Sequence, residues 1–144
     1  MSLESYSTTA LASPDRAAQW SAIIAETYFP LHLRFRNPER FEGRLERRIT
    51  GVAALSRLRT EAAEYERVPS HIRFSRAEEY LVTIPLSAAV RFRQAGREVR
   101  CAPGSFILER GDEPYRFSYD QRGDLYVMKI NRAVLAERIR APDR

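Results

Sequence analysis

The chain has 144 residues, of which 44% are hydrophobic and 30% charged, with a formal net charge of +5. A chain of this length and balance folds as one globular domain and needs neither a disulfide nor a metal to hold its core. Its apolar runs are far too short to span a bilayer, and its N-terminus lacks the basic and apolar segments of a signal peptide. We therefore expect a cytoplasmic protein with no membrane contact.

The positive charge comes almost entirely from arginine, because Lys129 is the only lysine among the 24 basic residues. These arginines are scattered along the chain and do not gather on one helix, so we expect no direct contact with DNA from this segment. The single cysteine, Cys101, excludes an internal disulfide.

The first part of the chain changes from irregular to helical. Residues 1–12 are small and polar without periodicity, and we expect a flexible N-terminus. Ser13 followed by Pro14 predicts a helix start, and Pro30 predicts its end. The apolar positions between them follow helical spacing at Trp20, Ile23, Ile24 and Tyr28. Trp20 could stack on a ligand, but packing of the helix on the body of the domain is the favoured interpretation.

After Leu31 the hydrophobic period becomes two, which is typical of strands. Ala95-Gly96 predicts a hairpin turn between two of them, and residues 66–80 form the least regular stretch. The expected strands lie within residues 31–35, 43–50, 52–62, 80–87, 89–102, 105–110, 114–119 and 124–130. Asn131 can cap a last helix whose apolar side carries Val134, Leu135 and Ile139.

This pattern predicts a mainly β fold, an antiparallel double-stranded β-barrel or jelly roll of the cupin kind with a flanking helix at each end. The expected division is a flexible N-terminus at 1–12, a barrel with its N-terminal helix at 13–131, and the start of a C-terminal helix at 132–144.

The residues that catalytic or metal chemistry requires are few. His32 and His71 are the only histidines, they lie far apart in the sequence, and neither has a second histidine at metal-ligand spacing. Cys101 has no histidine near it in sequence, and we expect it to be a small buried hydrophobic residue. Neither a nucleophile elbow nor a phosphate-binding glycine loop occurs. We expect no metal, no cofactor and no catalytic residue.

Several carboxylates lie beside predicted turns, where solvated caps are a more common role than acid–base chemistry. They are Glu78, Glu79, Asp112, Glu113 and Asp124.

A barrel interior that holds polar groups among apolar walls can bind a small molecule. Alternation along the strands brings six side chains into consideration as inward-facing ligand-binding residues: Arg47, Ser56, Tyr80, Phe92, Phe106 and Tyr115. A slip of one residue in register would instead place Arg47 in solvent.

An inward Arg47 would need a partner for its charge, because an unpaired buried guanidinium is very costly. Glu46 alternates to the other face of the same strand. The partner is then a ligand carboxylate, a ligand hydroxyl or a carboxylate from another strand. We favour the first, which predicts an anionic or polyhydroxylated effector.

The order of several short motifs resembles the N-terminal effector-binding domain of AraC/XylS-type transcriptional regulators, in its cupin-type subgroup. The resemblance covers nearly all of residues 18–140. It rests on Trp20, "YFPL" at 28–31, "FEGRL" at 41–45, "RVP" at 67–69, "EYLVTIPL" at 79–86, "QAGREVRCAPGSFILERGDEPY" at 94–115 and "LYVMKINRAVL" at 125–135. The sequence departs from the family pattern at Val68, Ala88, Ser105 and Asn131, where the family usually has threonine, glycine, an acidic residue and proline.

The resemblance implies a domain that senses a small molecule and dimerises, placed before two helix-turn-helix units that bind DNA. Those units do not occur in these 144 residues, so we expect a truncated regulator, a weak homodimer at most, and DNA contact only through the missing part. Two alternatives stay open. One is a stand-alone cupin-fold enzyme, an isomerase or an oxygenase, and the other is a dimerisation module with a filled core.

Overall fold

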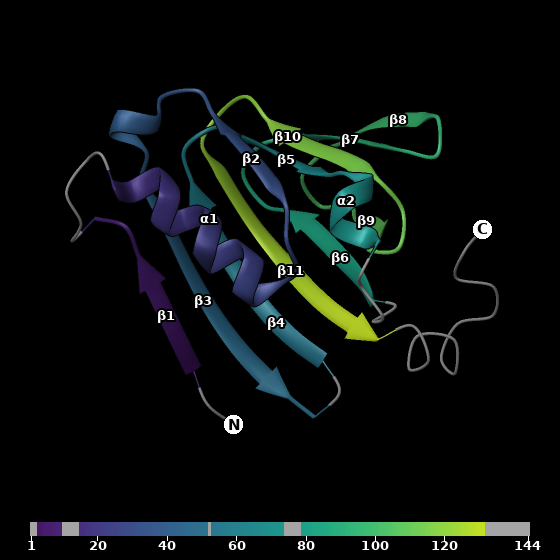
Figure 1. Ribbon diagram of the computed structural model, residues 1–144, viewed down its shortest axis with the longest axis horizontal. Helices are drawn as coiled ribbons and strands as arrows, with labels where there is room; N and C mark the ends of the chain where they lie inside the picture. Colours follow the sequence, from purple (N-terminus) through teal and green to yellow (C-terminus); the bar gives the residue numbers. More distant parts are fainter. Residues whose placement is uncertain (1–2, 10–14, 52, 74–78, 132–144) are drawn as a thin grey trace.

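Two antiparallel sheets pack face to face in the computed structural model (Figure 1). The structure describes residues 3–9, 15–51, 53–73 and 79–131. The hydrophobic core lies between the sheets and under one N-terminal helix. The predicted mainly β, cupin-like architecture is confirmed.

The larger sheet has six strands in the order β1-β3-β4-β11-β6-β9. Their bounds are β1 Leu3–Ser7, β3 Gly43–Thr50, β4 Ala53–Thr60, β11 Gly123–Asn131, β6 Glu79–Pro85 and β9 Ile107–Arg110. The long strand β11 is central and pairs with β4 on one side and with β6 on the other. The last strand of the sheet therefore ties together strands from the first and second halves of the chain.

The smaller sheet has five strands in the order β2-β5-β10-β7-β8. Their bounds are β2 His32–Phe35, β5 Ala63–Arg67, β10 Tyr115–Tyr119, β7 Val90–Gln94 and β8 Arg97–Cys101. Its central strand β10 carries the sequence YRFSY, in which Tyr115, Phe117 and Tyr119 are buried and the residues between them are not. This alternation turns all three aromatic rings of the strand toward the interior.

The predicted hairpin turn at Ala95-Gly96 is confirmed. Both residues have positive φ, 54° and 77°, as the two-residue turn between β7 and β8 requires. Glycine adopts this conformation without cost, whereas Ala95 adopts it against its own preference.

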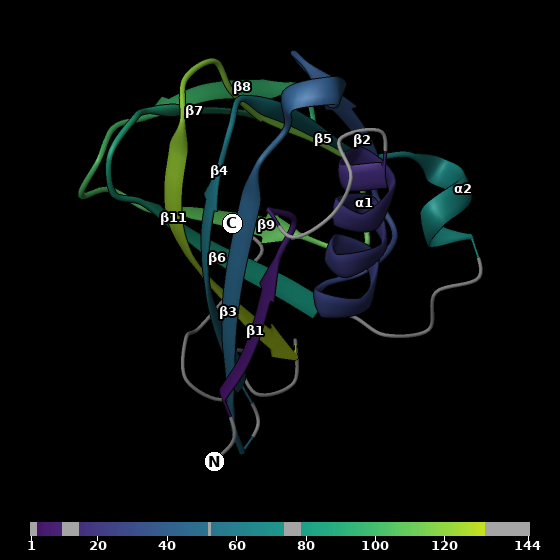
Figure 2. The ribbon, with the colours of Figure 1, turned by 90° about the vertical axis from the view of Figure 1, so that its left-hand side faces the viewer.

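Helix α1, Arg16–Thr27, flanks the sandwich beside β1 and β3 (Figures 1 and 2). Its buried face carries Trp20, Ile23 and Ile24 at helical spacing, and the Trp20 ring is fully buried. The packing interpretation of Trp20 is therefore confirmed. Its neighbour is the first residue of β3, Gly43, where an added Cβ would lie 2.8 Å from the Trp20 ring.

Three elements were not expected from the sequence. Residues 3–7, for which we expected no regular structure, form strand β1. Strand β5 and the short helix α2, Pro69–Ile72, lie where no separate element was predicted, and a single 3-10 turn, η2 at Pro38–Arg40, joins β2 to β3. The predicted last helix, with Val134, Leu135 and Ile139, lies outside the described residues.

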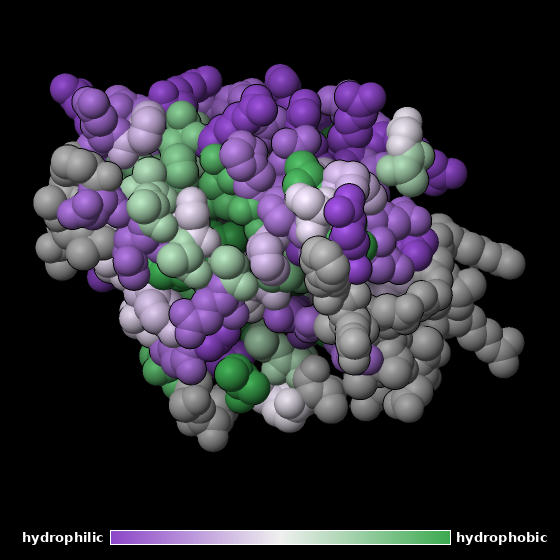
Figure 3. All heavy atoms as spheres, viewed as in Figure 1, coloured by the Kyte–Doolittle hydropathy of each residue, from purple (hydrophilic) through white to green (hydrophobic). Residues whose placement is uncertain are grey.

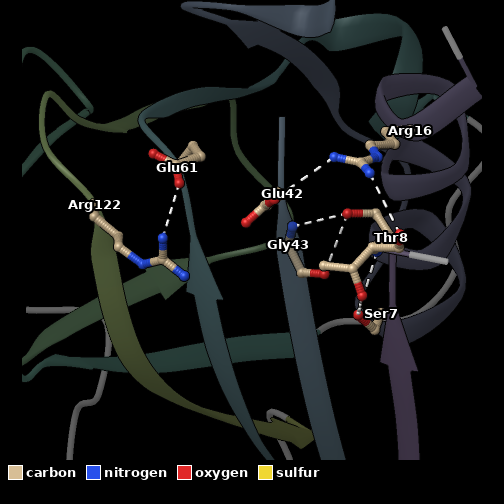
Figure 4. Close-up of polar contacts among 8 residues, drawn as sticks. Ser7, Thr8, Arg16, Glu42, Gly43, Glu61 and Arg122 are labelled. Atoms are coloured by element: carbon tan, nitrogen blue, oxygen red, sulfur yellow. Dashed lines mark hydrogen bonds and ion pairs between the residues drawn. The ribbon is translucent and has the colours of Figure 1, made fainter. Parts of the chain in front are cut away.

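Strand β1 is attached to the edge of β3 by backbone pairing and by a reciprocal contact at its end (Figure 4). The Thr8 amide donates to the Gly43 carbonyl at 3.0 Å, and the Gly43 amide donates to the Thr8 hydroxyl at 2.9 Å. Nearby, Arg16 of α1 lies 3.7 Å from the Glu42 carboxylate. These contacts fix an edge strand whose composition alone has little strand preference.

The face of the molecule seen in Figure 3 is mostly hydrophilic, with hydrophobic side chains interspersed. Within the part of the chain that the structure describes, no helix is long and apolar enough to cross a membrane.

Candidate functional site

A small cavity of about 30 Å³ lies between the two sheets, next to the C-terminal end of α1. This volume holds two water-sized groups, since one water needs roughly 10–15 Å³ by this measure. Half of its lining residues are aliphatic and come from α1, from Leu31 and from β4, β6 and β11. Its polar lining consists of Tyr28, Tyr65, Thr83, Glu109 and Tyr115.

The hydroxyl of Tyr65 is occupied by a chain of hydrogen bonds that runs away from the cavity. Thr60 donates to the Glu61 carbonyl at 2.7 Å, so it accepts from the Tyr119 hydroxyl. Tyr119 then accepts from Tyr65 at 2.8 Å, and Tyr65 accepts from the Trp20 indole at 3.4 Å. Each hydroxyl of the chain gives its proton to the next group, which leaves Tyr65 little capacity for a ligand.

Tyr28 is occupied in the same way. Ser56 donates to the Val127 carbonyl at 3.2 Å and therefore accepts from the Tyr28 hydroxyl. Burial raises the pKa of Tyr28 well above its usual value, so it stays a neutral donor. Lys129 donates to the Tyr28 carbonyl at 2.5 Å and holds this end of α1 in place.

Glu109 is the acidic group of the cavity. It projects inward from β9 beside Ile107, and only 3% of the residue is exposed. One carboxylate oxygen accepts a hydrogen bond from the Thr83 hydroxyl at 3.2 Å. Among the described residues no lysine or arginine forms an ion pair with it. Burial raises the pKa of Glu109 to about 8, because the charged form loses its hydration without gaining a cation.

Tyr115 faces the same cavity from β10 and is 4% exposed. Its ring packs against Phe92 at 5.6 Å and against Phe29 at 6.4 Å between centroids. Burial, followed by the nearby Glu109 carboxyl, raises the pKa of Tyr115 well above its usual value. Its hydroxyl has no hydrogen-bond partner among the described residues.

Arg67 packs on Phe29 and does not line the cavity. Its guanidinium donates to the carbonyls of Gly111 and Pro30, each at 2.9 Å, and lies 4.2 Å from the centre of the Phe29 ring. Burial lowers the pKa of Arg67, whose charge is satisfied by carbonyl dipoles and an aromatic face. Arg67 therefore fastens the segment after α1 to β5.

Of the six ligand-binding residues predicted from the sequence, Tyr115 lines the cavity. Ser56 and Phe92 are buried directly behind its lining, Ser56 as the partner of Tyr28 and Phe92 as the partner of Tyr115. These three predicted residues therefore belong to one region.

The inward placement of Phe106 and Tyr80 is wrong. Phe106 is 69% exposed, because Ile107 and Glu109 are the residues of β9 that face the interior. Tyr80 is buried, but alternation along β6 places it on the face opposite to Leu81 and Thr83, which line the cavity. The predicted face of β6 was shifted by one residue.

The partner of Arg47 is a side chain of the protein and not the ligand that we expected. The guanidinium of Arg47 forms an ion pair with Glu4 of β1, and its Nε donates to the same oxygen at 3.0 Å. Of the three partners considered for Arg47, the observed one is a carboxylate from another strand and not the favoured ligand carboxylate. Arg47 does not line the cavity, and the charged group that does is an acid.

Four polar residues of the cavity lining were missed, namely Tyr28, Tyr65, Thr83 and Glu109. The sequence carried a signal for Glu109, because it shares a strand face with Ile107, but the opposite face with Phe106 and Leu108 is equally apolar. Period-two reasoning therefore could not choose between the faces.

Within the described ranges, no three histidine, cysteine, aspartate or glutamate side chains converge on a point where they could hold a metal ion. The His71 ring accepts a hydrogen bond from the Val68 amide at 3.1 Å. Cys101 is buried, as expected, and burial raises the pKa of its thiol.

Comparison with solved structures places this architecture beside one transcriptional activator. The AraC-like transcriptional activator CuxR superposes with a TM-score of 0.80 at 20% identity, over 95% of this chain and 50% of that one. The chain therefore spans about half the length of CuxR.

Two further solved structures show weaker similarity. The Clostridium difficile EutQ protein has a TM-score of 0.49 at 8% identity, covering 63% of this chain and 64% of that one. The Schizosaccharomyces pombe Cnp3 cupin domain has a TM-score of 0.48 at 10% identity, covering 65% and 69%. None of the curated proteins compared with the sequence matches it.

The sequence itself matches the AraC-binding-like domain over residues 20–144. This range includes most of α1 and every strand of the two sheets except β1. This match confirms the resemblance found in the motifs. The chain therefore belongs to the AraC-binding-like family, the effector-binding domains typical of AraC regulators, a family that is usually non-enzymatic.

Proposed function

We propose that this domain is the sensor of an AraC-type transcriptional regulator and that it binds its small-molecule effector in the cavity between the two sheets, without catalysing a reaction. The observation that carries the proposal is the pair of polar groups, Glu109 and Tyr115, that face this cavity with unused hydrogen-bonding capacity. Buried polar groups are normally fully bonded, so such capacity in an apolar cavity suits a ligand.

The position of the cavity supports a sensing role. Its lining comes from both sheets and from the end of α1, so a ligand there contacts elements that are far apart in the sequence. An effector changes a regulator only if it binds two arrangements of the protein with different affinity. Displacement of the segment after α1, which Arg67 and Lys129 hold by its carbonyls, is a change that occupancy could drive.

The regulatory role extends beyond these residues. The domain would act in the cytoplasm, where it would bias the DNA-binding units of the same regulator, and a homodimer would form through the helices that follow the barrel. The expected open reading frame continues beyond residue 144 into two helix-turn-helix units. A frame that closes there would overturn the regulatory half of the proposal.

Effector binding is tested by native mass spectrometry of freshly purified protein, followed by a thermal-shift screen of small molecules. A compound that binds the folded state raises the melting temperature with the logarithm of its excess over Kd. The decisive comparison uses Val127→Ile, which adds one carbon to the cavity wall. The matched control is Val99→Ile on β8, where the side chain is exposed.

We expect Val127→Ile to weaken or abolish the shift and Val99→Ile to preserve it. Equal shifts in both variants would show that the compound binds elsewhere and would overturn the assignment of this cavity.

A further inference from the structure

We propose that the effector of this domain is a small organic cation, a protonated amine with a short apolar body, bound by the carboxyl of Glu109 and the ring and hydroxyl of Tyr115. This assignment of a ligand class rests on the proposed effector-binding role. It reverses the anionic effector that an inward Arg47 would have implied.

The first argument is the sign of the charge that the cavity offers. Arg47 is neutralised by Glu4 at the edge of the sheet, and Arg67 is bound to backbone carbonyls outside the cavity. Glu109 is the acid that faces the cavity, and its one hydrogen bond among the described residues comes from the neutral Thr83. A ligand cation would balance the negative charge of an ionised Glu109, for which the described residues offer no cation.

The second argument is the aromatic lining. Tyr28, Tyr65, Tyr115 and Phe117 all border the cavity. The hydroxyls of Tyr28 and Tyr65 are engaged elsewhere, so these residues offer the ligand their rings. Aromatic faces attract cations, and they do so more strongly where water is excluded. An anion would meet the negative faces of these same rings, which repel it.

The third argument concerns size. An ammonium group is about as large as a water molecule. The cavity of about 30 Å³ can hold this group but has little room for the rest of a ligand. The apolar body of the ligand would then press on the aliphatic lining, including Ile24 and Leu31 at the end of α1. This links recognition of the head group to displacement of that segment.

Binding of a cation would also move a proton. The groups around Glu109 are Thr83 on β6, Tyr28 after α1 and Tyr115 on β10. Arg47 acts on Tyr28 and Arg67 on Tyr115, and neither arginine forms an ion pair with Glu109. At pH 6.5 the Glu109 carboxyl, with a pKa of about 8, is neutral. A protonated amine binds the carboxylate, so the Glu109 proton is released to solvent as the ion pair forms.

The experiment titrates the protein with two sets of compounds that share a body and differ in the head group. The first set is isobutylamine, isobutanol and isobutyrate, and the second is benzylamine, benzyl alcohol and benzoate. Isothermal titration calorimetry at pH 6.5 in two buffers of different ionisation enthalpy gives both the affinity and the number of protons released.

We expect the amine of each set to bind at least tenfold more tightly than its alcohol or acid. Nearly one proton should be released per amine at pH 6.5, and almost none by isobutylamine at pH 9.5, where Glu109 is ionised before the amine binds. Glu109→Gln should lower amine affinity by roughly 10- to 100-fold, as for other hydrogen bonds to charged groups, and should abolish proton release. The matched control, Glu98→Gln on the exposed hairpin, should leave both unchanged.

The proton count needs no variant, so the proposal stays testable even if Glu109→Gln fails to fold. Binding of an alcohol or acid at least as tight as that of its amine would overturn the cationic ligand, and amine binding without proton release would overturn the release of the Glu109 proton. If an acid or alcohol bound and Val127→Ile weakened it, the proposed sensing function would stand and only the ligand class would fall.

Discussion

Glu109 is a carboxyl held in an apolar cavity without a cation, and this position couples folding to pH. Its pKa is about 8 in the folded protein and near 4.5 in an unfolded chain. Between these values the folded state holds one proton more than the unfolded state. The free energy of unfolding therefore falls as the pH rises through this window, and the dependence levels off above it.

Glu109→Gln should remove this dependence. Chemical denaturation between pH 5 and 9 should show the wild-type free energy of unfolding falling by at most about 5 kcal/mol, from 1.36 kcal/mol for each unit of the pKa difference. The variant should change much less. His71, whose pKa is lowered by burial, contributes in the opposite direction in both proteins and cancels in the comparison. Parallel profiles for the two proteins would show that Glu109 is already ionised at neutral pH.

Arg47 acts at the edge of the larger sheet by its contact with Glu4, which binds β1 to β3. Arg47→Ala should loosen this edge strand without unfolding the sandwich, because β1 has pairing on one side alone. Hydrogen exchange should become several-fold faster for the amides of Leu3–Ser7 and stay unchanged in β11.

Arg57→Ala is the matched control, because Arg57 pairs with Asp124 between the central strands β4 and β11. It should leave the exchange of β1 unaltered. Equal protection of β1 in wild type and Arg47→Ala would mean that backbone pairing alone holds the strand.

At the scale of elements, α1 and β3 meet where Gly43 faces the Trp20 ring. A Cβ at Gly43 would lie 2.8 Å from that ring, which real side chains do not tolerate. We expect Gly43→Ala to lower the free energy of unfolding by about 1–3 kcal/mol, the usual cost of overpacking a core. Urea denaturation measures the change.

A double-mutant cycle with Trp20→Leu separates this clash from any backbone preference of glycine. In the Trp20→Leu background, the smaller side chain should relieve the clash, so Gly43→Ala should cost clearly less than in wild type. Equal costs in the two backgrounds would place the effect in the backbone of β3 instead.

At the scale of the whole molecule, the two sheets and α1 share one hydrogen-bonded core. The chain from Trp20 through Tyr65 and Tyr119 to Thr60 runs from α1 through the smaller sheet to the larger one. Breaking any part leaves buried hydroxyls without partners, so partial unfolding is costly. We expect one cooperative transition in urea.

The single tryptophan, Trp20, makes this prediction easy to check. Its fluorescence reports the contact of α1 with the core, and far-ultraviolet circular dichroism reports the sheets. The two unfolding curves should coincide. A fluorescence change at clearly lower urea would mean that α1 detaches before the sandwich unfolds.

What the sequence determined was local. Alternation in GRLERRIT and in YRFSY predicted β3 and β10, the Ala95-Gly96 pair predicted the hairpin, and the helical spacing around Trp20 predicted α1 and its buried face. Each of these signals lies within about ten residues, so it can be recognised without knowledge of the fold.

What only the tertiary structure decided was which face of each strand turns inward and which residues meet there. In β6 and β9 both faces are apolar enough to be buried, so alternation could not distinguish Tyr80 from Leu81 or Phe106 from Ile107. The choice depends on the opposing sheet. Glu109 meets Thr83 through the pairing of β9 with β6, and it faces Tyr115 across the space between the two sheets. Long-range pairing of β1 with β3 likewise gives Arg47 its partner. Alternation along a strand determines which residues share a face. The packing of the two sheets determines which of the two faces is buried and what it contacts.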